Sequence, residues 1–228
     1  MANRQLFYGM KVVTHVRLIT LLLVLALLAG CTTGGKVIPK PVLEIPAVPE
    51  ETTVTRFDDG RKGFIITEVV SFDEAVRRDF DQAVIYLHNN AFDQAIELLE
   101  RVIVTAPEVT APYINLALAY QKIGQSEPAE KCLKTALELI PGHPLASHQY
   151  GLLLRKTGRF AEARTIYERS LMEFPEYRPI HKNLGILCDI YLGDQECAIS
   201  QYERYNEMGH EDQQVKLWIS DLHMRLGQ

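Results

Sequence analysis

The chain lacks an apolar run long enough to cross a bilayer as a helix. Its longest weakly polar stretch, residues 18–30, contains 13 residues and is interrupted by Thr20, whereas a spanning helix needs about 20 apolar residues. A run of that length suits the core of a secretory signal, and Lys11 and Arg17 supply the basic flank ahead of it. We therefore expect residues 1–30 to be a removable signal, with Met1 and Met10 as alternative initiators.

Basic residues are scarce once that segment is set aside. Three of the 24 Lys and Arg residues (Arg4, Lys11 and Arg17) lie in it, which leaves 21 basic residues against all 29 acidic ones, a formal charge of −8. Binding to a phosphate backbone needs clustered Lys and Arg. The composition therefore argues against nucleic acid as a partner.

Motifs for catalysis or for holding a cofactor are also missing. The chain has no Gly-x-Ser-x-Gly elbow, no glycine-rich phosphate loop and no His-Glu-x-x-His zinc pattern. His143 and His148 are five residues apart, which does not place them on one helical face. We read them as surface or turn histidines rather than metal ligands, and we expect no enzyme activity, no metal and no cofactor.

The end of the apolar run carries a specific signal. Leu28-Ala29-Gly30-Cys31 closely resembles the bacterial lipobox. The resemblance implies cleavage between Gly30 and Cys31, a diacylglycerol on the Cys31 sulfur and an acylated amino terminus, which together make a durable membrane anchor. The alternatives are an ordinary signal peptide with a coincidental cysteine, or an uncleaved anchor. Thr32 stands where inner-membrane lipoproteins of this kind have Asp, so we expect an outer-membrane lipoprotein that faces the periplasm.

We predict that residues 31–73 form the lipidated amino terminus and a proline-rich tether. Prolines at 39, 41, 46 and 49 favour an extended spacer without a core. Residues 64–70 have strand-like composition, but one short strand has nothing obvious to pair with, and we expect it to pack as an extended arm on the first helix.

Beyond residue 74 the sequence repeats itself at a fixed spacing, which is the signature of a repeat architecture. The recurring positions are Pro107, Pro141 and Pro175; Ala95, Ala129 and Ala163, with Ala198 one residue late; Leu116, Tyr150 and Leu184; and Gly124 and Gly158. Prolines at this spacing end helices, small residues allow close helix contacts, and pairs of helices that cannot bury an apolar face alone do so by stacking.

This pattern resembles the tetratricopeptide repeat family, in which each repeat forms two antiparallel helices. The resemblance implies that residues 74–228 are an all-α, right-handed superhelical solenoid of about four helix pairs. The fourth unit has an extra residue near Gly193 and no terminal proline. The last segment has Val215, Trp218, Ile219, Leu222 and Leu226 on one helical face, which predicts a C-terminal capping helix.

In this family partners dock on a concave groove lined by the first helices. An apolar row recurs there in all four repeats and an amide row in the last three, and together they predict a groove that binds a protein or peptide: Val84, Leu118, Leu152 and Ile186, and Asn115, Gln149 and Asn183. The simpler alternative is that these residues serve packing between first helices. The Lys and Asn clamp that holds carboxylate termini in some relatives is absent from the first pair, where Phe80 and Val84 stand instead.

Three cysteines remain besides Cys31. Cys188 and Cys197 fall on the two helices of the fourth pair and can form a disulfide, while Cys132 is left over. Buried free thiols are the alternative.

These features predict a lipid-anchored periplasmic scaffold for a protein partner. Lipoproteins of this layout include pilotins that help type IV pilus secretins assemble, which suggests a role in pilus or secretin biogenesis. An adaptor for peptidoglycan hydrolases or another envelope complex is the alternative. An enzyme with an unrecognised site is the least favoured reading.

Overall fold

The computed structural model describes residues 52–57, 63–68, 73–209 and 211–227 of the chain. The segment predicted to be a signal, Cys31 and most of the predicted tether lie outside these residues. None of the helices in the described ranges is both long and apolar enough to cross a membrane.

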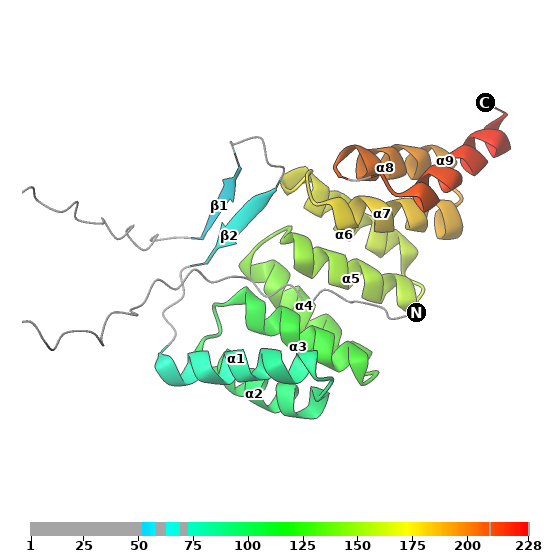
Figure 1. Ribbon diagram of the computed structural model, residues 1–228. Coiled ribbons are helices and arrows are strands. Elements are labelled where there is room, and N and C mark those ends of the chain that lie inside the picture. The colour runs from blue at the N-terminus through cyan, green and yellow to red at the C-terminus, as the bar shows by residue number, and fades with distance from the viewer. Residues whose placement is uncertain (1–51, 58–62, 69–72, 210, 228) are drawn as a thin grey trace, which may run out of the picture.

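The repeat region folds into consecutive antiparallel helix pairs (Figure 1). They are α1 (Glu74–His88) with α2 (Phe92–Thr105), α3 (Thr110–Lys122) with α4 (Ser126–Leu139), α5 (Pro144–Lys156) with α6 (Phe160–Glu173), and α7 (Arg178–Ile186), continued by the π-helix η1 (Leu187–Leu192), with α8 (Gln195–Glu207); α9 (Gln213–Leu226) follows. The predicted solenoid of four helix pairs and a capping helix is therefore confirmed.

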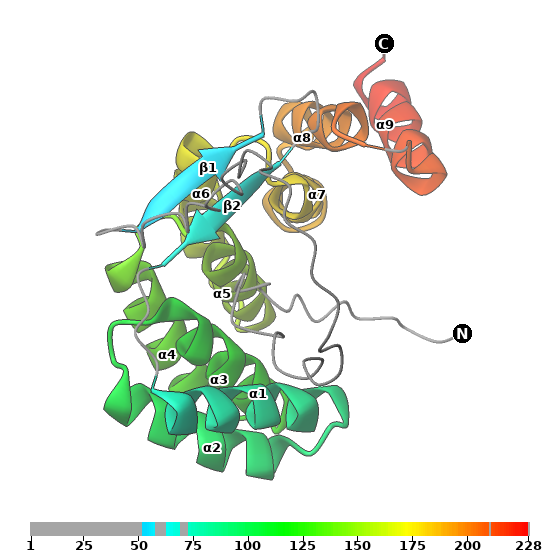
Figure 2. The ribbon, with the colours of Figure 1, turned by 60° about the vertical axis from the view of Figure 1, so that its left-hand side comes forward.

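The pairs stack into a curved, two-layered array. Each first helix packs against the first helix of the next pair, and each second helix packs against its own partner and the following first helix. Figure 2 shows the array as an arc, with α1, α3, α5 and α7 on its inner side and the outer helices α2, α4, α6 and α8 on the other. Stacking of this kind makes one continuous core from units that are each too small to have one.

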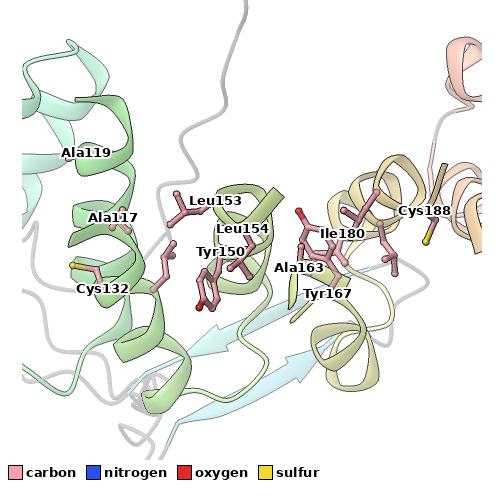
Figure 3. Packing of buried hydrophobic residues seen from close by; sticks show 14 of the residues in the cluster. Ala117, Ala119, Cys132, Tyr150, Leu153, Leu154, Ala163, Tyr167, Ile180 and Cys188 are labelled. Carbon is pink, nitrogen blue, oxygen red and sulfur yellow. The ribbon is translucent and has the colours of Figure 1, made fainter. Parts of the chain in front are cut away.

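The centre of each pair is filled by one small and one large residue that face each other. Equivalent positions of successive repeats supply Ala83, Ala117, Gly151 and Gly185 from the first helices, opposite Leu99, Leu133, Tyr167 and Tyr202, and all of these residues are buried. The larger tyrosine in the last two pairs is matched by the smaller glycine. A Cβ at Gly151 would lie 2.1 Å from Tyr167 Cε1, and one at Gly185 would lie 2.5 Å from Tyr202 Cε1. Figure 3 shows Tyr167 close to Ala163 and Ile180 within this core.

The turn inside each pair needs a left-handed residue. Gly124 and Gly158 have φ of 82° and 78°, values that side chains rarely adopt. In the first pair the equivalent residue is Asn90, with φ of 58°, and asparagine is among the non-glycine residues that best tolerate this conformation. The first pair thus makes the same turn without glycine.

The extra residue of the fourth pair is absorbed as a π-helix. Residues Leu187–Leu192 leave the α-helical pattern, and the chain closes at Gly193, with φ of 66°, where Asp194 N donates to Cys188 O over 2.9 Å. One inserted residue in a helix is usually accommodated by a wider π turn. The insertion therefore shifts α8 by one residue without breaking the stack.

Cys188 and Cys197 form a disulfide that joins η1 to α8, with 5.9 Å between their Cα atoms. Cys132 is a buried free thiol. Burial raises its pKa to about 11, so this thiol is protonated and unreactive at neutral pH.

The capping helix packs as its apolar spacing predicted. Val215 and Leu222 are fully buried, and Trp218, Ile219 and Leu226 lie against the same core cluster. Lys182 of α7 donates to Asp212, the N-cap of α9, over 2.7 Å. The end of the solenoid is thereby closed by a helix that shields the fourth pair.

The prediction for residues 64–70 was wrong in two respects. Strand β2 (Phe64–Thr67) does have a partner: it pairs antiparallel with β1 (Thr53–Arg56), which belongs to the segment expected to be tether. The hairpin also lies on the loop between α6 and α7 rather than on the first helix, as the ring of Phe64 is 4.9 Å from that of Phe174. A strand of four residues gives little sequence signal, and its site of packing was set by residues more than 100 positions away.

Candidate partner-binding surface

The seven residues predicted to line a groove lie on the inner helices at equivalent positions. Val84 is on α1, Asn115 and Leu118 on α3, Gln149 and Leu152 on α5, and Asn183 and Ile186 on α7. We call this set the inner-helix surface. Each of its members is half-buried, so none is a full core residue and none is a freely exposed side chain. Such a surface can be contacted by a partner with little loss of side-chain entropy.

The apolar members of the inner-helix surface fall into two groups. Leu118 packs against the buried cluster of Ile114, Ala136 and Ala146, and Ile186 packs against the main core, so these two also serve the packing of the solenoid. Val84 and Leu152 belong to neither cluster. Val84 and Leu152 are therefore the apolar members that do not take part in the packing of these clusters.

The amide members also differ in what they do. Asn183 Nδ2 donates to Pro179 O over 3.0 Å and lies 2.9 Å from His148 Nε2, so its amide is used within the solenoid. No side-chain hydrogen bond in the described part of the chain engages Asn115 or Gln149. The packing alternative therefore holds for Asn183, and partner binding by Asn115 and Gln149 stays a prediction.

Two histidines around α5 are more buried than a surface or turn reading implies. His143 is 3% exposed, and its Nδ1 accepts from Ala146 N over 3.3 Å, which caps α5. His148 lies beside Tyr177 and accepts from Asn183. Burial lowers the pKa of both imidazoles to about 4, with the charge of Arg155 adding to the effect at His148. Both histidines are neutral at neutral pH, and they serve the scaffold.

The β-hairpin stands beside the inner-helix surface, a proximity that the sequence did not reveal. Arg56 Nε donates to Glu176 over 3.0 Å, and its Nη2 donates to Glu173 O over 2.6 Å. The ring of Phe64 is 6.3 Å from that of Tyr177, and Tyr177 in turn contacts His148 of α5. The hairpin is thus joined through one tyrosine to the helices that carry the inner-helix surface.

A second attachment holds the other end of the hairpin. Thr110 donates from N to Glu68 Oε2 over 2.8 Å and from Oγ1 to Glu68 Oε1. Helix α3 has Val109 at its N-cap and no side-chain cap from that residue, so Glu68 satisfies an amide donor that would otherwise be unpaired. The segment that leads from the tether is therefore fixed to both the second and the third helix pairs.

One group of potential metal ligands is engaged by the scaffold itself. Across the described ranges, one cluster has three His, Cys, Asp or Glu side chains close enough to share an ion: Cys188, Asp194 and Cys197. Both sulfurs are in the disulfide, and Asp194 accepts from Cys197 N and pairs with Arg164. The cluster is therefore fully used by the scaffold.

A curved array of helix pairs with a half-buried inner surface defines a class of repeat scaffold that binds other proteins. The family comparison agrees with this class. Residues 108–172, which span α3 to α6, match the family model described as tetratricopeptide repeat. No curated protein matches the chain.

Solved structures of the same fold are similar to this chain over most of its length. MamA from Desulfovibrio magneticus RS-1 superposes with a TM-score of 0.60 at 16% identity, over 69% of this chain and 88% of that one. Pseudomonas aeruginosa pilF gives 0.60 at 21% identity, over 67% and 69%. A thermophilic TPR protein from Thermus thermophilus gives 0.53 at 18% identity, over 67% and 83%. At these identities the likeness establishes the tetratricopeptide-type solenoid fold.

Proposed function

We propose that this protein is a lipid-anchored scaffold of the cell envelope that holds a partner protein on its inner-helix surface. The observation that carries the proposal is the half-buried row on equivalent positions of α1, α3, α5 and α7, in which Val84 and Leu152 are not committed to the core. Asn115 and Gln149 stand three residues ahead of Leu118 and Leu152 on the same faces. An extended or helical segment of a partner can therefore gain apolar contacts and backbone hydrogen bonds together.

The anchor follows from the lipobox resemblance at Leu28-Ala29-Gly30-Cys31. Acyl chains on Cys31, together with a proline-rich tether, keep the solenoid within reach of one membrane. Assembly of a type IV pilus or its secretin is the specific role we favour, because the layout resembles that of pilotin lipoproteins and because pilF of Pseudomonas aeruginosa has the same fold. The second candidate is an adaptor for peptidoglycan hydrolases.

The partner can be identified by capture from solubilised envelopes with the full chain as bait. We expect Val84→Asp with Leu152→Asp to reduce capture at least about tenfold, because two charges would have to be desolvated against an apolar partner. Val104→Asp with Met172→Asp is the matched control, because these side chains are 82% and 75% exposed and belong to outer helices. A secretin among the captured proteins supports the pilus role, and a peptidoglycan enzyme supports the adaptor role.

If the Val84 and Leu152 variant keeps its helical circular dichroism spectrum and still captures the same protein, the inner-helix surface is not the binding site. If the control variant loses capture equally, the effect is one of charge and not of position.

The anchor is tested separately by membrane fractionation. We expect the wild-type chain to sediment with membranes and to incorporate radiolabelled palmitate, and Cys31→Ala to lose the label. Several acyl chains at about 0.8 kcal/mol per buried methylene account for stable attachment, whereas a protein without them relies on weaker contacts. Equal labelling of the wild type and Cys31→Ala would contradict lipidation at this residue.

A further inference from the structure

We propose that the inner-helix surface takes an acidic segment of its partner, an extended stretch in which Asp or Glu alternates with aliphatic residues. The inference rests on the proposed function and adds the chemistry of the partner to it. Two observations support it: the inner helices α3, α5 and α7 carry no carboxylate, and one side-chain nitrogen on each of α3 and α5 has no acceptor among the described residues.

Charge is separated between the layers of the solenoid from the second helix pair onward, whereas the inner helix of the first pair, α1, carries both acidic and basic residues. The outer helices α2, α4, α6 and α8 carry three carboxylates each. The inner helices α3, α5 and α7 carry none, and their charged residues are all basic: Lys122, Arg155, Lys156, Arg178 and Lys182. In a chain whose formal charge is −5, these three neighbouring inner helices therefore carry only basic charge, and we call Lys122, Arg155 and Lys156, in the last turns of α3 and α5, the basic strip. Such a strip attracts acidic segments and repels basic ones.

Part of this charge is neutralised at the C-terminal end of the solenoid. Lys182 pairs with Asp212 over 2.7 Å, and Asp189 of η1 pairs with Arg225 over 3.0 Å. Arg155 and Lys156 of α5 have no carboxylate partner in the described part of the chain, and Arg155 Cζ lies 5.9 Å from the centroid of the Tyr191 ring of η1. The helix dipole favours basic residues in the last turn of a helix, which explains why these two side chains are positively charged. The dipole does not supply a hydrogen-bond acceptor for their N–H groups. The centre of the strip, on α5, is therefore where a ligand carboxylate would bind.

Two donors along the strip have no acceptor among the described residues. Arg155 Nη1 and Gln121 Nε2 are both buried without a hydrogen-bond partner, and they occupy equivalent positions of successive repeats, on α5 and α3. Buried donors are nearly always paired, and a guanidinium offers donors only. These two nitrogens therefore lack an acceptor, and a carboxylate is the strongest acceptor that a peptide side chain supplies.

These donors adjoin the apolar row of the inner-helix surface. Gln121 follows Leu118 by three residues and Arg155 follows Leu152 by three, so each pair shares one helix face. A ligand that places an aliphatic side chain at Leu152 therefore has its next residues near Arg155. The surface thus fits a segment that carries aliphatic and acidic side chains together. The clamp for carboxylate termini in other tetratricopeptide proteins uses different positions, where this chain has Phe80 and Val84.

The experiment uses the full chain in detergent and three sets of labelled dodecapeptides, acetylated and amidated so that no terminal carboxylate is present. All sets share Leu and Val at fixed positions, and the remaining positions are Glu, Gln or Lys. We expect the Glu set to bind about tenfold or more tightly than the Gln set, and the Lys set to bind weakest. Arg155→Gln with Lys156→Gln should remove the preference for Glu over Gln. Lys131→Gln with Arg169→Gln is the matched control, because it removes the same charge from exposed positions of α4 and α6.

Each outcome decides the inference. A Glu preference that is lost in the α5 variant and kept in the control supports it. Glu and Gln sets that bind equally, and that both lose binding with Leu152→Asp, overturn it while leaving the proposed function intact. Absence of binding by all sets also overturns it, and the envelope capture then tests the proposed function independently. Glu peptides that bind only after deletion of residues 37–51 would assign the strip to the chain's own acidic, aliphatic segment, which also overturns the assignment to a partner.

Discussion

Gly151→Ala is expected to lower the free energy of unfolding by about 3 kcal/mol. The new Cβ would lie 2.1 Å from Cε1 and 2.2 Å from Cζ of Tyr167, far inside van der Waals contact. Tyr167 is fully buried, so its ring cannot move into solvent, and the third helix pair has to separate. Alanine is the better helix former by about 1 kcal/mol, but this gain is smaller than the cost of the clash.

The same solenoid contains the combination that should restore the fit. The second pair has Ala117 opposite Leu133 where the third has Gly151 opposite Tyr167, and all four are buried. We expect Tyr167→Leu alone to cost about 2 kcal/mol, because the smaller side chain leaves a gap above the glycine. The double variant should be more stable than either single variant, because leucine and alanine together fill the space.

Urea or thermal unfolding of the four proteins, followed by circular dichroism, completes the double-mutant cycle. Additive effects would show that positions 151 and 167 do not contact each other in solution, and this would contradict the packing described for the third pair. Gly185→Ala, whose Cβ would lie 2.5 Å from Tyr202 Cε1, provides an independent repeat of the test in the fourth pair.

Mild acid is expected to destabilise the protein through His143 and His148. Burial lowers the pKa of each imidazole to about 4 in the folded chain, against about 6.5 in the unfolded chain. Between these two pKa values the unfolded state therefore binds more protons than the folded state. The contribution of the neutral imidazoles to the free energy of unfolding is complete above about pH 6.5 and is lost as the pH falls toward 4. Between about pH 8 and about pH 5 we expect a loss on the order of 2 kcal/mol per histidine.

The effect of the histidines on stability can be distinguished from that of the carboxylates, because the two effects occur in different pH ranges. Hydrogen bonds from Arg159, chiefly, lower the pKa of Glu130 to about 2, so the stability from this carboxylate is lost only below about pH 4.5. His143→Asn keeps an N-cap side chain for α5, and His148→Gln keeps an acceptor for Asn183. We expect the double variant to unfold with little pH dependence between about pH 8 and pH 5.

Thermal midpoints measured across this range provide the comparison. A wild-type midpoint that is unchanged from about pH 8 to pH 5 would show that these imidazoles are not buried as neutral groups. An equal slope in the wild type and the double variant would assign the effect to other residues.

The positions of helices and turns were readable from the sequence because they depend on local and periodic signals. Prolines at 107, 141 and 175, glycines at 124 and 158, and the apolar face of the last segment predicted where helices end and where the cap begins. The extra residue near Gly193 was visible as a change of period, but its form as a π-helix over Leu187–Leu192 depends on how the fourth pair closes onto its neighbours.

The candidate site was only partly predictable, because spacing places residues on a face without saying what covers them. The rows of the inner-helix surface do lie on α1, α3, α5 and α7. Asn183 differs from the other two amides of its row, since its bond to His148 joins two helix pairs. The burial of His143 could not be read from a turn motif either, because neighbouring elements bury it.

The sequence by itself determined that this chain is a stack of helix pairs, since its fixed repeat spacing, helix-ending prolines and small contact residues recur within each unit. Only the tertiary structure decided where the β-hairpin lies, which amides are used and how charge divides between the layers. Arg56 meets Glu176 across 120 positions, and Glu68 meets Thr110 across 42. Such contacts leave no periodic signal in the sequence, because they form only once stacking has fixed the curvature of the solenoid.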